Sequence, residues 1–128
     1  MTMGKILLVE DEDLLRRLIR EILESRGYEV VLASHGEEAL EFARNSTEPL
    51  TLMVTDVVMP HMNGPDLMVQ IRLIHPELKV IFISGYTGNS NDTIQLALKQ
   101  PGVAFLQKPF RLHALIGLVE SLVGSKVD

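Results

Sequence analysis

The sequence contains no cysteine and no tryptophan, and only 5% of its 128 residues are aromatic. A chain without cysteine has neither a disulfide framework nor a thiolate metal site, and this fits a reducing cytoplasm. No apolar run approaches the roughly 20 residues that a membrane-spanning helix needs, and no basic region with a cleavage site follows Met1. We therefore expect a cytoplasmic protein that makes no membrane contact.

Positive charge is also scarce. The chain has 12 Lys and Arg residues against 17 Asp and Glu residues, and its formal net charge is −5. Binding to a phosphate backbone usually requires a patch or stripe of basic side chains, and the sequence contains no such stripe. We therefore expect no nucleic-acid partner.

The apolar residues, 46% of the chain, fall into short strand-like runs separated by amphipathic segments. A chain of this length can bury one core, so we expect residues 1–128 to form a single domain. The central run stops at Asp56, and a turn containing proline and glycine follows it at once. The five predicted strands cover residues 5–9, 28–33, 50–56, 79–83 and 103–106.

A helix is predicted after each strand. Gly27 stops the first helix, and Ser34 and Glu37 have the spacing of a capping box at the start of the second, which runs through residue 44. Pro65 stands at the first position of the third. The fourth, residues 93–99, follows a polar, Gly-rich loop; this helix is short and weakly amphipathic, and we expect it to be mobile.

Apolar stripes on the first, third and last helices should face the sheet. They are Leu14, Leu15, Leu18, Ile19, Ile22 and Leu23; Leu67, Met68, Ile71 and Ile74, before His75-Pro76 ends the third helix; and Leu112, Leu115, Ile116, Val119, Leu122 and Val123. Five strands alternating with five helices predict an α/β fold, a doubly wound five-stranded parallel sheet with helices on both faces. In the strand order 2-1-3-4-5, which is common in such sheets, the first and third strands are neighbours.

Polar or charged residues stand at the ends of four of the five predicted strands. Glu10 and Asp11 follow the first, Asp56 ends the third, Ser84 follows the fourth and Lys108 follows the fifth. Ligands of open α/β sheets gather at the carboxyl ends of the strands, so these groups should share one crevice. Three carboxylates in one place repel one another unless a cation neutralises them, and an all-oxygen cluster suits Mg²⁺.

This set of residues predicts a phosphorylated carboxylate. Asp56 would attack phosphorus as the nucleophile. The Lys108 ammonium would hold a phosphoryl oxygen, and the Ser84 hydroxyl would donate to another, so that metal, lysine and hydroxyl together stabilise the charge on the transferred group.

In these residues the chain resembles the receiver domain of two-component response regulators. The resemblance covers nearly the whole sequence and lies in four motifs, which are Val9-Glu10-Asp11-Glu12, Asp56 to Gly64, Ser84-Gly85 and Lys108-Pro109-Phe110. It implies a flavodoxin-like receiver fold in which Asp56 accepts a phosphoryl group from a histidine kinase or a histidine phosphotransfer domain. It also implies Mg²⁺ on Asp11, Asp56 and the backbone carbonyl of Val58, with Glu10 acting through water, and often a cis peptide bond before Pro109.

The same resemblance implies a switch, in which Ser84 and Phe105 rearrange on phosphorylation and alter the face made by the fourth helix, the fifth strand and the fifth helix. Two features depart from the usual family pattern: Glu10 replaces an aspartate, and Phe105 replaces a tyrosine. In the family, the positions of Val58 and Tyr86 tune the access of water to the acyl phosphate. Both side chains are bulky and lack a carboxylate or amide, so our hypothesis is a long-lived phosphoryl state.

Two other functional classes, a phosphatase and a dinucleotide-binding module, also deserve comparison with the sequence. A phosphatase that forms an aspartyl-phosphate also starts from a strand-end aspartate, but it needs a second acid two residues later, where this chain has Val58. A dinucleotide-binding module needs a Gly-rich turn after the first strand, and the turn here, residues 10–13, is acidic throughout. The acidic side chains of Glu12 and Asp13 are explained by the dipole of the first helix alone, which favours negative charge at its start. The four histidines lack the spacing of metal ligands, and we expect them to lie at the surface. The loop of residues 84–88 resembles the same loop in receivers at the ends of hybrid sensor kinases. The sequence is equally compatible with a stand-alone regulator. The sequence names no downstream partner.

Overall fold

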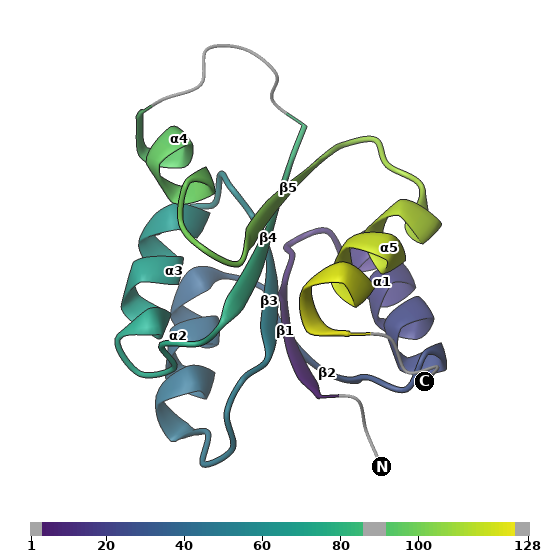
Figure 1. Cartoon of the computed structure of the whole chain (residues 1–128), viewed down its shortest axis with the longest axis horizontal. Coiled ribbons are helices and arrows are strands. Elements are labelled where there is room, and N and C mark those ends of the chain that lie inside the picture. Colours follow the sequence, from purple (N-terminus) through teal and green to yellow (C-terminus); the bar gives the residue numbers. More distant parts are fainter. Residues whose placement is uncertain (1–3, 86–91, 125–128) are drawn as a thin grey trace.

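The computed structural model describes residues 4–85 and 92–124, and this part of the chain forms one parallel sheet with helices on both faces (Figure 1). The strand order is β2-β1-β3-β4-β5, so the predicted fold and order are confirmed. The strands are β1 (Lys5–Val9), β2 (Glu29–Ala33), β3 (Leu52–Asp56), β4 (Lys79–Ser84) and β5 (Val103–Gln107). The helices are α1 (Asp13–Ser25), α2 (Gly36–Asn45), α3 (Gly64–Arg72), α4 (Asp92–Leu98) and α5 (Leu112–Val123). None of these helices is long and apolar enough to cross a bilayer.

Two apolar cores lie on opposite faces of the sheet. Helices α1 and α5 cover one face and α2, α3 and α4 cover the other (Figure 1). Side chains alternate between the faces along each strand: in β1, Ile6 and Leu8 pack toward α1 and α5, while Leu7 and Val9 pack toward α2 and α3. Because both faces are covered, the central strands are apolar almost throughout, and every residue of β3 is buried.

The first helix is less buried than its apolar pattern predicted. Ile19 and Leu23, four residues apart, are buried, whereas Leu14 and Leu18 are 66% and 41% exposed. The prediction that both of these leucines face the core is wrong. The first turn of α1 begins at the carboxyl edge of the sheet, where none of the described elements covers Leu14.

The third helix ends earlier than predicted, at Arg72. Leu73 N–H donates to the Gln70 carbonyl and Ile74 N–H to the Ile71 carbonyl, so the backbone changes to a tighter turn. This turn rotates Ile74 away from the core, and its side chain is 40% exposed, contrary to the prediction.

The cap of α2 lies one residue later than predicted. His35, not Ser34, is the N-cap, and its Nδ1 accepts a hydrogen bond from Glu38 N–H at 3.2 Å. Glu38, rather than Glu37, reaches back and accepts from Ser34 N–H at 2.6 Å. The reciprocal bonding of a capping box is therefore present with different partners.

Candidate functional site

The carboxyl ends of the strands bring the predicted site residues together. Glu10 follows β1 and is only 2% exposed, and Asp56 is the last residue of β3 and 8% exposed. A pocket of about 370 Å³ opens at this edge of the sheet, and its lining includes Asp11, Asp56, Val58, Ser84, Gly85 and Lys108. The crevice predicted from the strand ends therefore exists.

Three carboxylates form a cluster in and beside this pocket. One oxygen atom from each of Glu10, Asp11 and Asp56 lies within 4.8 Å of the others. Three hard oxygen ligands at this spacing fit Mg²⁺, which prefers oxygen and keeps several of its waters. Two of the three acids are buried, and burying a carboxylate is costly without a cation. The residues present thus fit a divalent cation.

Lys108 supplies one positive charge to the cluster. Its ammonium nitrogen lies 3.1 Å from Asp56 Oδ1 and 3.3 Å from Glu10 Oε1. The peptide bond between Lys108 and Pro109 is cis, as the family resemblance implied. Lys108 N–H donates to the Ser84 carbonyl at 2.8 Å, which fixes the end of β5 against the end of β4.

Glu10 and Asp56 have pKa values above those of free carboxyl groups. The pKa of Glu10 is raised to about 7, mainly by burial and also by the charge of Asp56, while the hydrogen bond from Glu12 N–H and the charge of Lys108 oppose the rise. Burial also raises the pKa of Asp56, although Lys108 opposes this shift. Burial would lower the pKa of Lys108, but its contacts with Asp56 and Glu10 outweigh burial and raise it. One lysine does not fully neutralise the carboxylates, and a divalent cation would complete the charge balance.

The loop after β3 brings α3 close to the backbone of Asp56. Gly64 N–H donates to the Val57 carbonyl at 2.8 Å. A Cβ atom at Gly64 would overlap the backbone oxygen of Asp56 and lie 3.1 Å from Phe82 Cε1. Glycine is therefore required at the start of this helix by close packing. Asn63 caps it, accepting from Asp66 N–H at 2.8 Å.

Two other predicted residues lie at the margins of the site. The Val58 side chain is 74% exposed at the pocket, and Phe105 is 38% exposed on β5, outside the pocket lining. Alternation along β5 places Phe105 on the same face as Val103, which packs against the α2–α4 core. Tyr86, the other residue of the predicted long-lived state, lies outside the described residues.

Arg16 was not singled out by the sequence, which placed it on the outer face of α1. In the structure its guanidinium donates to the Glu10 carbonyl at 2.8 Å and also pairs with Asp13. Its side chain is only 18% exposed. The spacing of Asp13 and Arg16, three residues apart on one helix, was the available signal.

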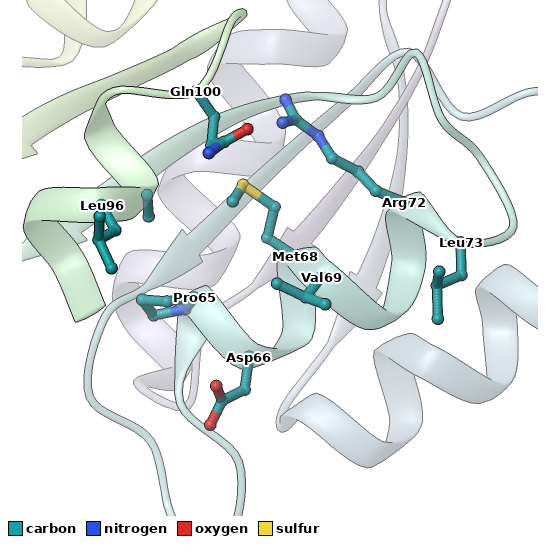
Figure 2. Close-up of a pocket in the computed structure, with 9 residues that line it drawn as sticks. Pro65, Asp66, Met68, Val69, Arg72, Leu73, Leu96 and Gln100 are labelled. Atoms are coloured by element: carbon teal, nitrogen blue, oxygen red, sulfur yellow. The ribbon is translucent and has the colours of Figure 1, made fainter.

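A second, larger groove of about 430 Å³ lies between α3 and α4 (Figure 2). Exposed Val69, Leu73 and Leu96 contribute to its lining. Arg72, which also borders it, donates to the carbonyls of Leu78 and Pro101. Among the described residues that line it, Asp66 is the only carboxylate, so this groove lacks the cluster of oxygen ligands seen at the strand ends.

Comparisons with known proteins agree with the fold and with the arrangement of the strand-end residues. The model of the response regulator receiver domain matches residues 6–120. The chain belongs to this receiver family. It is therefore a receiver domain of two-component, phosphorelay signalling, as the motifs predicted.

Relatives of this receiver occur both within long proteins and alone. It is 41% identical over 121 residues to the sensor kinase CckA of Brucella abortus, an alignment that covers 92% of this chain but 12% of CckA. It is 36% identical over 121 residues to the response regulator receiver protein CpdR of the same organism, covering 94% of this chain and 98% of CpdR. The crystal structure of the CckA receiver domain matches with a TM-score of 0.79 at 38% identity, over 94% of this chain and 99% of that one.

Proposed function

We propose that this receiver accepts a phosphoryl group on Asp56, in a Mg²⁺-dependent transfer from the phosphohistidine of a histidine kinase or histidine phosphotransfer domain. The observation that carries the proposal is the 3.1 Å contact between Lys108 Nζ and Asp56 Oδ1, beside the carboxylates of Asp11 and Glu10. An aspartate that served only as a turn residue at a strand end would require neither the lysine nor the other two carboxylates.

The transfer can be written with these residues in named roles. An Asp56 oxygen forms a bond to phosphorus while the bond from phosphorus to the histidine nitrogen breaks, and its electron pair stays on that nitrogen. Lys108 and the Ser84 hydroxyl hold phosphoryl oxygens. Mg²⁺, held by Asp11, Asp56 and the Val58 carbonyl, would neutralise charge on the transferred group.

Glu10 is assigned an indirect role toward the metal. Its Oε1 is near Lys108, and its Oε2 accepts from Glu12 N–H at 3.0 Å. Since both oxygens already have partners, contact with Mg²⁺ through a water molecule is favoured over direct binding.

The docking of a protein donor is supported by exposed apolar side chains beside the pocket. Leu14, three residues after Asp11, and Val58, two residues after Asp56, are 66% and 74% exposed. Apolar groups around a charged centre suit a protein partner.

The output of the switch is assigned to the face made by α4, β5 and α5. Ser84 lies in the pocket at the end of β4, and Phe105 lies on the adjacent strand, where its ring is partly exposed. We assign to phosphorylation a movement of the Ser84 hydroxyl toward the phosphoryl group and an inward turn of Phe105. Phe105 lacks a ring hydroxyl, so packing alone would hold each state.

The test is incubation of the protein with acetyl phosphate and Mg²⁺, followed by intact mass measurement. We expect one acid-labile phosphoryl group per chain, lost in Asp56→Asn and retained in Asp66→Asn, which removes an exposed carboxylate from α3. Multiple turnover of a small phosphate ester would favour the aspartyl-phosphate phosphatase. No modification of the wild type, with or without Mg²⁺, would exclude the proposed function.

A further inference from the structure

We propose that Arg16 is a positioning residue for the adjacent acids Glu10 and Asp11, and that it sets the affinity of the site for Mg²⁺ without touching the metal. The inference rests on the proposed function, because it concerns the metal that Asp11 and Asp56 would hold. It starts from the contact of the Arg16 guanidinium with the Glu10 backbone carbonyl at 2.8 Å.

The segment that carries Asp11 is held on both sides. Before it, the Glu10 carbonyl accepts from Arg16, and Glu10 N–H donates to the Ala33 carbonyl at 3.1 Å. After it, Glu12 N–H donates to the Glu10 carboxylate at 3.0 Å. Asp11 itself is exposed and projects from between these anchors. Its orientation therefore depends on these three hydrogen bonds to the residues on either side of it.

Arginine suits this position better than other cations. One arm of its planar guanidinium, Nη1, reaches the Glu10 carbonyl, while the other, Nη2, pairs with Asp13 on α1. A lysine ammonium is a point charge on a flexible stem and does not present this fixed fork. Arg16 thus joins the first turn of α1 to the end of β1. Residues that orient metal ligands in this way commonly govern metal affinity.

The sign of the effect separates positioning from simple electrostatics. Removing a positive charge near three carboxylates should by itself favour a divalent cation. If Arg16 positions Asp11, its removal should instead weaken Mg²⁺ binding. Arg17 is the matched control, because it is the next residue on the same helix, carries the same charge and is exposed.

The experiment measures the Mg²⁺ dissociation constant directly, by calorimetric titration at pH 8 and a temperature at which each variant is folded by circular dichroism. For Arg16→Ala we expect the constant to rise about tenfold or more, within the usual range for an outer-shell partner. Arg16→Lys should recover part of the affinity. Arg17→Ala should leave the constant unchanged or slightly lower.

Each result decides the question. Equal Mg²⁺ affinity in wild type and Arg16→Ala, or equal weakening in Arg17→Ala, would overturn the role of Arg16 while leaving phosphorylation of Asp56 intact. If Arg16→Ala does not fold, Arg16→Lys decides, because full affinity in that variant would also contradict the proposal. Absence of Mg²⁺ binding by the wild type would instead contradict the proposed function.

Discussion

Lys108 Nζ lies 3.1 Å from Asp56 Oδ1, although Asp56 ends β3, Lys108 follows β5, and β4 separates these two strands in the sheet. The contact reaches across the carboxyl end of β4, where Ser84 lines the same pocket. It therefore depends on the order of three strands in the sheet.

Replacing this lysine should change the titration of its partner. In Lys108→Met, we expect the pKa of Asp56 to rise further above its ordinary range, because the hydrogen bond and charge that oppose burial are removed. Carbon-detected NMR of the side-chain carboxyl groups across a pH series measures this. Lys99→Met, which removes an exposed lysine, is the control, and an unchanged Asp56 titration in Lys108→Met would contradict the assigned contact.

The raised pKa of Glu10 makes stability depend on pH. Its pKa rises from 4.5 in its ordinary state to about 7 in the folded protein, so between these values the folded state binds more protons than the unfolded state. The contribution of Glu10 to stability is therefore greatest at low pH. It declines as pH rises from about 4.5 to about 7, by on the order of 3 kcal/mol.

Urea unfolding of wild type and Glu10→Gln at several pH values isolates this effect, because the variant lacks the titrating group. Without Mg²⁺, we expect the unfolding free energy of the wild type relative to Glu10→Gln to decline as pH rises. At saturating Mg²⁺ this decline should disappear, since the metal stabilises the ionised carboxylates. A difference that stays constant with pH would show that Glu10 titrates normally.

Two glycines provide a matched pair of opposite expectations. Gly64→Ala should destabilise the protein by about 1–3 kcal/mol, because the added Cβ would overlap the Asp56 carbonyl oxygen. Gly117→Ala, in α5 with no heavy atom within 4 Å of its Cβ, should stabilise it by about 0.5–1 kcal/mol. Chemical denaturation measures both. Equal effects of the same sign would show that the close approach at Gly64 is not limiting.

The lifetime of the phosphoryl group tests the role of Val58. Its side chain is 74% exposed at the pocket and has no group that can orient water. In Val58→Asn, a carboxamide is available for this purpose, and we expect the labelled protein to lose its phosphoryl group several-fold faster. Val69→Asn makes the same change at a 56% exposed position on α3 and should decay like wild type. Decay of Val58→Asn at the wild-type rate would refute a long-lived state set by this residue.

The arrangement of the strands and the clustering of the acids with Lys108 followed from the sequence alone. An apolar run that ends in a carboxylate marks the end of a buried strand, and parallel strands place their ends at one edge. The sequence therefore predicts that Asp56 and Lys108 lie at the same edge of the sheet. The site residues themselves stay a functional prediction until phosphorylation is measured.

Other features could not be read from residue type. Helical spacing predicts which side chains share a face, but not whether a neighbouring element covers each turn, and so Leu14 was wrongly assigned to the core. The early end of α3 results from a change in backbone hydrogen bonding after Gln70. The bond from Arg16 to the Glu10 carbonyl depends on the path of the loop between β1 and α1, which charge patterning does not encode.

The two ends of the described chain lie away from the pocket. Tyr28, just before β2, donates its hydroxyl proton to the carbonyl of Gly124 at 3.1 Å, which places the end of α5 at the amino edge of the sheet, where Gly4 enters β1 (Figure 1). A fluorescent reporter attached at either of these two positions, Gly4 or Gly124, would therefore lie across the molecule from Asp56. Labelled versions of this receiver should remain open to their phosphate donor.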